Sequence, residues 1–236
     1  MTAPARPYDN DIAPAAALMA DPTRAAILLA LLPGRPLAAG ELARMAGVGA
    51  ATASFHLGKL LDGGMVSVIR QGRHRYYRLA GHEVATALEA IALISPDVPV
   101  RSLRQSREAE ALAEARTCYD HLAGRAGVAL LEALLAGGDL ERSGTSSTRY
   151  EVTGAGREKF RAFGINLEEV RTTRRQFAGE CIDWTQRRGH LNGALAAAIT
   201  TRLFALRWIE PGKRRRSVRV TETGAEGLAV TFGMSR

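Results

Sequence analysis

The sequence is poor in cysteine and contains no long apolar run. Its 236 residues include two cysteines, Cys118 and Cys181, which are too few for a disulfide scaffold, so we expect free thiols or metal ligands. No apolar run is long enough to span a bilayer, and the N-terminal stretch lacks the apolar core of a signal peptide. We therefore expect no membrane partner and a cytoplasmic location.

The catalytic motifs that short sequence patterns reveal are also missing. The chain has no glycine-rich dinucleotide loop after a predicted strand, no phosphate-binding Gly-Lys-Ser/Thr loop and no Gly-x-Ser-x-Gly elbow. We therefore predict that the protein is not an enzyme. A metal- or thiol-dependent sensor or enzyme with a DNA-binding appendage stays open as an alternative.

Positive charge is what the sequence has in excess. The formal net charge is +8, which favours a polyanionic partner, although a merely soluble basic protein can have the same balance. A hydrophobic content of 46% suits packed globular structure, and the length suits one large domain or two ordinary ones.

Residues 37–79 carry the pattern of a winged helix-turn-helix. Apolar spacing predicts one helix at 41–46 and a second at 50–61, joined by a Gly-Val-Gly turn. Residues 65–79 then predict a two-stranded β-hairpin. In proteins with this order of elements, the second helix lies in the DNA major groove and the hairpin contacts DNA beside it.

The second helix and the hairpin supply the candidate DNA contacts. We expect Ala53, Leu57, Leu60 and Leu61 to face the core, which leaves a face of small and polar residues for the groove. The candidate contacts are Ala50, Ala51, Ser54, Phe55 and Lys59 of the helix and Arg70, Gln71, Arg73, His74 and Arg75 of the hairpin. An ordinary amphipathic helix followed by a solvated basic hairpin is the alternative, but the order of the two favours DNA binding.

Four segments resemble the ArsR family of bacterial winged-helix repressors: Ala20–Arg24, Glu41–Ala43, Ser54–Leu57 and Gly72–Leu79. The resemblance covers residues 11–95. Members of that family are dimers that bind palindromic operators and leave DNA when an inducer binds. The resemblance therefore implies a double-stranded DNA operator, a homodimer and an effector, with dimer helices at 11–20 and 82–94.

The chain departs from the metal-sensing members of that family. They often carry a Glu-Leu-Cys-Val-Cys motif in the first helix of the helix-turn-helix, where this chain has Glu41-Leu42-Ala43-Arg44-Met45. Another subset places Asp/His pairs on the last dimer helix, where His82 is the only histidine and lacks a partner at helical spacing. Neither familiar metal site is present.

The second half of the chain contains an internal repeat. The motif at 121–124 (HLAG) recurs at 190–193 (HLNG), and each copy continues into an apolar helix, a β-hairpin and a final helix. We predict two degenerate winged-helix-like units, at about 118–164 and 181–236. Chance similarity of Ala/Leu-rich helices is the alternative.

Three further elements are expected around these repeats. Residues 95–99, with two prolines, predict a linker, and a charged helix is expected at about 103–122. The hairpin at 213–219 is rich in arginine, and both a DNA contact and a solvated turn stay open for it.

The repeated motifs also contain the metal-ligand types of the second half. The candidate metal or effector residues are Cys118, Asp120 and His121 from the first copy and Cys181, Asp183 and His190 from the second. On the predicted helix Cys118 and His121 share a face. Two thiolates and two imidazoles suit zinc or another thiolate-binding metal or metalloid.

Four interpretations of these residues stay open. They are buried structural residues, a metal or metalloid sensor, or a thiol redox switch between the two cysteines. The fourth, which overlaps these, is that the effector is an organic inducer. We expect such an inducer to lie between the two halves, against Trp184, Phe177 and Tyr119. The sequence does not choose among them.

Together these patterns predict a mainly α-helical α+β protein with small β-hairpins. We expect a winged helix-turn-helix DNA-binding and dimerisation domain at 1–95 and a sensor domain of two repeats at 96–236. The predicted function is that of an effector-released homodimeric repressor of the ArsR type. A non-specific architectural DNA binder is a further alternative, and the sequence does not separate repressor from activator.

Overall fold

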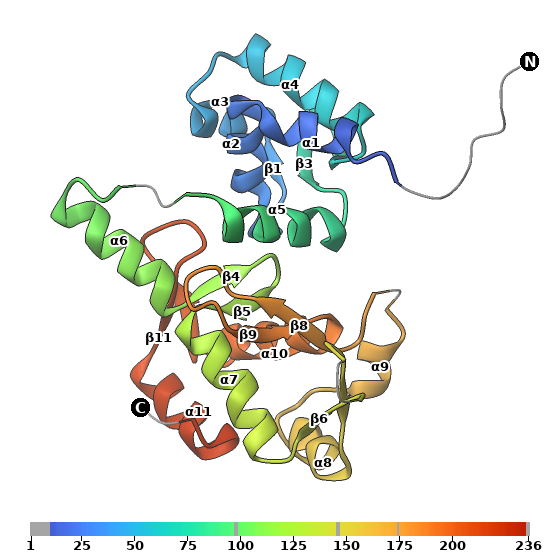
Figure 1. The fold of residues 1–236 in the computed structure, drawn as a ribbon, viewed down its shortest axis with the longest axis vertical. Helices are drawn as coiled ribbons and strands as arrows, with labels where there is room; N and C mark the ends of the chain where they lie inside the picture. Colours follow the sequence, from blue (N-terminus) through green and yellow to red (C-terminus); the bar gives the residue numbers. More distant parts are fainter. Residues whose placement is uncertain (1–9, 97–98, 145–146, 174, 235–236) are drawn as a thin grey trace, which may run out of the picture. The chain divides into compact units, whose positions relative to one another are not determined.

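The protein has two compact units, residues 1–85 and 86–236 (Figure 1). The structure, a computed structural model, describes residues 10–96, 99–144, 147–173 and 175–234. The expected linker thus lies partly outside the described residues, at 97 and 98, as does the end of the second repeat, at 235 and 236. The predicted assignment of 1–95 to DNA binding and 96–236 to sensing stays a prediction.

The first unit is a winged helix-turn-helix. Its elements are α1 (Ala13–Ala20), α2 (Pro22–Leu31), β1 (Leu37–Ala38), α3 (Ala39–Ala46), α4 (Ala50–Asp62), β2 (Val66–Gln71), β3 (His74–Leu79) and the start of α5 (His82–Ile94). The three strands form an antiparallel sheet in the order β1-β3-β2. α2, α3 and α4 pack against one another, which confirms the predicted helix-turn-helix with its hairpin.

Local sequence explains where these helices begin and end. The side chain of Asp21 accepts a hydrogen bond from the Arg24 amide at 2.9 Å, and Pro22 occupies the first turn of α2. Gly47 ends α3 at φ +69°, in the left-handed region that favours glycine. The turn into α4 therefore depends on this glycine.

The apolar face of α4 is narrower than predicted. Ala53, Leu57 and Leu60 are fully buried, as expected, but Leu61 is 39% exposed. The prediction for Leu61 was wrong, because a residue one position after Leu60 lies about 100° further round the helix. The buried stripe thus keeps to the 3- and 4-residue spacing that the core requires.

The second unit contains the repeat. Its elements are the rest of α5, α6 (Leu103–Glu114), β4 (Arg116–Cys118), β5 (His121–Ala123), α7 (Arg125–Ala136), β6 (Leu140–Arg142), β7 (Tyr150–Val152), α8 (Gly154–Ala162), α9 (Leu167–Arg171), β8 (Gly179–Ile182), β9 (Gly189–Asn192), α10 (Ala194–Ala205), β10 (Ile209–Pro211), β11 (Val218–Val220) and α11 (Glu222–Phe232). Each copy thus runs hairpin, helix, hairpin, helix. The first hairpin of each copy lies upstream of the helix-hairpin-helix order that the sequence predicted.

The predicted helix at 103–122 was wrong at its C-terminal half. α6 ends at Glu114, Ala115 is extended, and residues 116–123 form the hairpin β4–β5. Every second residue from Arg116 to Cys118 is buried, which suits a strand, and Tyr119 in the turn has φ +59°. The charged residues up to Glu114 fit a helix, and the sequence therefore gave no sign that the pattern changes there from helical to strand-like spacing.

The two copies contact each other through reciprocal pairs of elements. The residues before β11 pair with β4, through the Thr117 amide and the Arg216 carbonyl at 2.8 Å. In the same way the Tyr150 amide at the start of β7 donates to the Ala178 carbonyl just before β8 at 3.1 Å. α7 packs against β9 and α10 against β5 (Figure 1). One apolar core spans both copies. The copies therefore form a single folded body.

The glycine of the repeated HLxG motif has a backbone role. Gly124 and Gly193 cap α7 and α10 at φ +77° and +93°. A Cβ on Gly193 would lie 2.7 Å from the carbonyl oxygens of Gln176 and Phe177, and one on Gly124 would lie 2.8 Å from that of Ala113. Both the backbone angle and the space exclude a side chain at these positions.

A second repeated glycine gives a test of the fold. In α8, a Cβ on Gly156 would lie 2.1 Å from the Asp139 carbonyl oxygen, whereas nothing lies within 4 Å of one on Gly154. We expect Gly156→Ala to lower the free energy of unfolding by about 1–3 kcal/mol through overpacking. Gly154→Ala, the control, should leave it nearly unchanged. Both tryptophans, Trp184 and Trp208, lie in the second unit, so urea unfolding followed by tryptophan fluorescence measures the effect. Equal midpoints for the two variants would contradict the packing.

Candidate functional site

All ten candidate DNA-contacting residues lie on the protein surface. On α4, the side chains of Ala50, Ala51 and Ser54 are exposed on the face opposite the buried stripe. Phe55 is 60% exposed, and the Lys59 ammonium lies over its ring, 4.6 Å from the centroid. An exposed aromatic ring on a small-residue helix face is costly in water and suits contact with a thymine methyl group.

The hairpin presents its charges in the same way. β2 and β3 pair from Val66–Leu79 to Gln71–His74, so Gly72 and Arg73 form the tip, with Gly72 at φ +57°. The candidate residues of the hairpin, Arg70, Gln71, Arg73, His74 and Arg75, are all exposed. Arginines with free access to solvent at a hairpin tip are suited to phosphate oxygens.

A second candidate site lies within the repeats of the second unit. Cys118, His121, Cys181 and His190 are all buried, and their ligand atoms lie within 4.8 Å of one another. The rings of His121 and His190 stack with centroids 5.2 Å apart. We call these four residues the cysteine–histidine cluster.

Hairpin register assembles the cluster. Cys118 is the cross-strand partner of His121 in β4–β5, and Cys181 is the partner of His190 in β8–β9. The sequence predicted that Cys118 and His121 share a helix face, which was wrong. They meet instead across a hairpin, because directly opposed residues on antiparallel strands have adjacent side chains.

The two remaining candidate residues, Asp120 and Asp183, lie beside the cluster. Asp120 Oδ1 is 3.4 Å from His121 Nδ1, and Asp183 Oδ2 is 3.9 Å from His190 Nδ1. Both carboxylates are also engaged by arginine: the Arg175 Nη1 lies 2.5 Å from Asp120, and Arg116 Nη2 lies 3.0 Å from Asp183. Asp120 therefore orients the His121 ring, whereas Asp183 is held by Arg116, and neither carboxylate is part of the cluster.

Arg116 carries its charge into the interior. It has no exposed surface, pairs with Asp183 and lies 3.8 Å from the Glu89 carboxylate of α5. Asp183 also accepts hydrogen bonds from the Thr185 and Gln186 amides. Burial by itself raises the pKa of Asp183, but Arg116 and these donors lower it below its ordinary value.

The four cluster residues differ in how they hold protons. The hydrogen bond from Cys118, aided by His121 and Asn192, lowers the pKa of Cys181 well below its ordinary value. The same bond to Cys181, together with burial, raises the pKa of Cys118. Burial, aided by the charge of His121, lowers the pKa of His190 to about 3. These surroundings therefore favour the thiolate form of Cys181 and the neutral form of His190, and both forms are lone-pair donors.

His121 behaves differently from His190. Burial opposes its charged form, but hydrogen bonds with Asp120 and Cys181 raise its pKa above the ordinary value. The sequence did not single out Asn192, whose Nδ2 donates to Cys181 Sγ at 2.8 Å. Its place in the second HLxG motif was the available signal.

Three arginines of the 213–219 hairpin have acidic partners within the second unit. Arg214 pairs with Glu108, Arg216 with Glu89, and Arg219 with Glu210. These carboxylates reduce the net positive charge of the hairpin. The DNA contact that the sequence left open gains no support from this arrangement.

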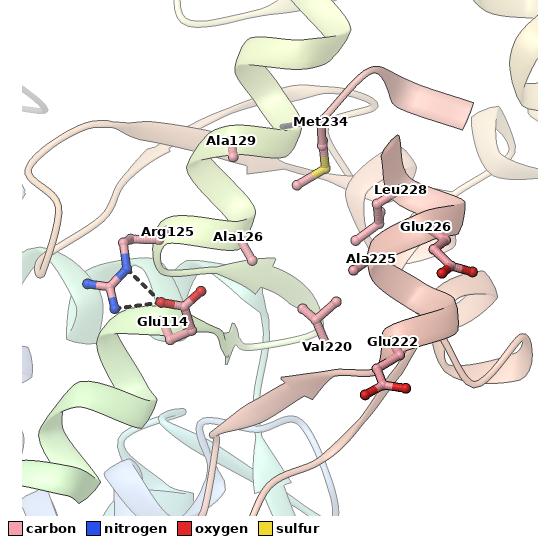
Figure 2. Close-up of a pocket in the computed structure, with 10 residues that line it drawn as sticks. All are labelled: Glu114, Arg125, Ala126, Ala129, Val220, Glu222, Ala225, Glu226, Leu228 and Met234. Atoms are coloured by element: carbon pink, nitrogen blue, oxygen red, sulfur yellow. Dashed lines mark hydrogen bonds and ion pairs between the residues drawn. The ribbon is translucent and has the colours of Figure 1, made fainter. Parts of the chain in front are cut away.

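The second unit also has an open pocket between α7 and α11 (Figure 2). It has a volume of about 670 Å³ and an apolar floor that includes Ala126, Val220 and Leu228. At its edge Arg125 Nε donates to Glu114 at 2.7 Å. The aromatic residues considered for an organic inducer do not line this pocket. The Arg116 guanidinium lies over the Trp184 ring, and the Arg171 guanidinium lies over the Phe177 ring.

Comparison with known proteins concerns first the N-terminal part. Residues 19–69 match the family model of a helix-turn-helix domain. The crystal structure of NolR from Sinorhizobium fredii is 31% identical and covers 36% of this chain and 85% of its own, with a TM-score of 0.34. That of the transcriptional repressor BigR from Xylella fastidiosa is 27% identical and covers 38% and 90%, with a TM-score of 0.35.

One curated relative covers far more of the chain. It is an uncharacterized HTH-type transcriptional regulator, YdfF, from Bacillus subtilis (strain 168), 44% identical over 214 residues, which are 91% of this chain and 93% of the relative. The chain belongs to the ArsR-type winged helix-turn-helix transcriptional regulators. The resemblance noted from the sequence is thereby confirmed. Because the match spans nine-tenths of this regulator, it includes residues of both units.

No single helix in the described part of this regulator is long and apolar enough to cross a membrane. The bent pair α1 and α2 passes such a test by length and composition. Four residues of α2 are buried in the core of the first unit.

The buried ion pair of this regulator gives a second test. Asp183→Asn leaves the Arg116 charge without its main partner in the interior, so we expect a loss of about 3–5 kcal/mol in the free energy of unfolding. Glu210→Gln, the control, removes the surface pair with Arg219, which contributes about 1 kcal/mol or less. Urea unfolding followed by tryptophan fluorescence measures both. Similar losses in the two variants would show that the buried pair is not needed.

Proposed function

We propose that this regulator is a homodimeric, cytoplasmic repressor that leaves its operator when an effector binds the second unit. One observation carries the DNA part of the proposal: the ten candidate contacts are exposed, while the apolar face of α4 is buried. A recognition helix with that division presents a complete surface to the major groove.

The contacts divide by chemistry. Ser54 and Phe55 suit base edges, because a hydroxyl bonds to bases and a ring contacts a thymine methyl group. Lys59 and the hairpin arginines suit phosphates, which fix the position of the protein on the duplex without reading its sequence. In this proposal α4 recognises the base sequence of the operator, and the hairpin binds its phosphate backbone.

Dimerisation follows from apolar surface that the single chain leaves exposed. α1 is almost entirely apolar and has no buried residue. In the last turns of α5, Ile91 is 41% and Ile94 is 83% exposed. We propose that α1 and α5 form the dimer contact, so that two α4 helices address the halves of a near-palindromic operator.

Effector release requires that the effector bind one state of the protein better than the other. α5 begins at His82 in the first unit and continues to Ile94 in the second, where Glu89 is buried against Arg116 and Arg216. We propose that changes in the second unit act on the dimer helix through this carboxylate.

The operator contact is tested with the double variant Ser54→Ala/Arg75→Ala. We expect at least 10-fold weaker binding to a DNA site selected from genomic fragments by the wild-type protein, with a shallower salt dependence because a phosphate contact is lost. Arg161→Ala, which removes an exposed arginine from α8, is the control and should bind as the wild type. Fluorescence anisotropy at several salt concentrations measures both.

Two outcomes of this titration contradict the proposal. One is unchanged affinity of the double variant at physiological salt. The other is selection that yields no preferred sequence, which is the behaviour of an architectural DNA binder.

The dimer contact is tested by charge on α5. We expect Ile91→Asp/Ile94→Asp to shift the protein from dimer to monomer, because two buried carboxylates disfavour the interface. Val230→Asp, at an apolar position of α11 that is 87% exposed, is the matched control and should stay dimeric. Sedimentation velocity measures the mass. A wild-type monomer at micromolar concentration, or a dimeric double variant, refutes the contact.

A further inference from the structure

The cysteine–histidine cluster has the composition and spacing of a metal centre. Each repeat contributes one sulfur and one imidazole, all buried, with ligand atoms within 4.8 Å of one another. In a tetrahedral zinc site the bond lengths place ligand atoms roughly 3.3–3.8 Å apart. If the four side chains move by about 1 Å or less, which rotation about their side-chain bonds allows, all four ligand atoms can therefore bind one ion.

His190 points to a missing partner. It has no exposed surface, and neither of its ring nitrogens has a hydrogen-bond partner among the residues that the structure describes. Buried polar atoms are almost always paired, because leaving one unpaired costs free energy. A nitrogen that lies among two sulfurs and a second imidazole is explained if it bonds to a metal ion.

The surroundings support the same interpretation. Asp120 Oδ1 lies 3.4 Å from Nδ1 of His121, within hydrogen-bond distance, whereas Asp183 Oδ2 lies 3.9 Å from Nδ1 of His190, beyond that distance. A carboxylate in the position of Asp120 orients metal-binding histidines in known metal sites. The amide of Asn192 donates to Cys181 Sγ, as donors beside metal thiolates do.

We propose that Cys118, His121, Cys181 and His190 together bind one divalent ion of the zinc class and that this ion fastens the two repeats to each other. Four protein ligands complete a tetrahedral shell, so the site is closed and has no position for a reacting water. The soft sulfur and imidazole set disfavours magnesium and calcium. The ion is held, and it does not catalyse.

A redox switch between the two cysteines explains less of the arrangement. A disulfide needs two sulfurs only, whereas here two buried histidines lie beside the same sulfurs, and one of them is hydrogen-bonded to a carboxylate through Nδ1. The repeat also supplies one sulfur and one nitrogen from each copy at equivalent hairpin positions. A shared ion accounts for all four residues.

This inference rests on the proposed function only for its regulatory consequence. If the second unit is the sensor, the ion either is the effector itself or must be bound before the second unit can bind its effector. Ion binding itself requires no DNA, so the two proposals fail separately.

The direct experiment is titration of the full-length, metal-free, reduced protein with Co²⁺. We expect one ion per chain, with the visible bands of tetrahedral cobalt and a near-ultraviolet charge-transfer band from thiolate. Zn²⁺ should displace the cobalt and raise the thermal midpoint of the second unit. These readouts come from the wild-type protein and do not depend on variants that fold poorly.

Variants identify the ligands. Cys181→Ser and His190→Ala should each weaken Zn²⁺ binding at least 100-fold, and Asp120→Asn, which leaves the ligands in place, about 10- to 100-fold. His82→Ala removes a histidine outside the cluster and should bind as the wild type. Competition with a chromophoric chelator measures the affinities.

Three outcomes overturn the proposal. They are a wild-type protein without the thiolate band, full affinity in Cys181→Ser or His190→Ala, and a Cys118–Cys181 disulfide that forms in air while no metal binds. Loss of operator preference with intact cobalt binding instead refutes the proposed function and leaves the ion site standing.

Discussion

The second unit depends on one buried charge. Arg116 has no exposed surface, so its guanidinium must be neutralised from within, and Asp183 and Glu89 do so from different parts of the chain. Asp183 also accepts from the Gly124 amide at the start of α7, at 2.6 Å. The pair thus ties the first hairpin of one repeat to that of the other. The residues of the cysteine–histidine cluster belong to those same two hairpins.

Internal duplication explains why the cluster has two matching halves. Each copy places a cysteine and a histidine on opposed strands and a glycine at positive φ after them. The copies then pack against each other, α7 on β9 and α10 on β5, and the two histidine rings stack. A repeated motif of one thiol and one imidazole becomes a set of four ligands without any further residue.

The sequence was a good guide where local pattern decides structure. The helix-turn-helix, its hairpin and the repeat could be predicted because apolar spacing and glycine positions act over short distances. The hairpin at 116–123 could not, because the charged run before it continues a helical pattern and the burial of Arg116 depends on Asp183, 67 residues away. The prediction that Leu61 is buried was wrong because Leu61 lies one residue after Leu60 and is therefore rotated out of the buried face. The role of Glu89 depends on residues far away in the sequence and left no local signal.

The two units follow different physical requirements. The DNA-contacting surface needs exposure and positive charge, while the cluster needs burial and lone-pair donors. The most direct measurement on the second requirement is X-ray absorption at the zinc edge of the loaded protein. We expect a first shell of two sulfurs at about 2.3 Å and two nitrogens at about 2.0–2.1 Å. A shell of oxygen and nitrogen alone would contradict a shared ion at the centre of the repeats.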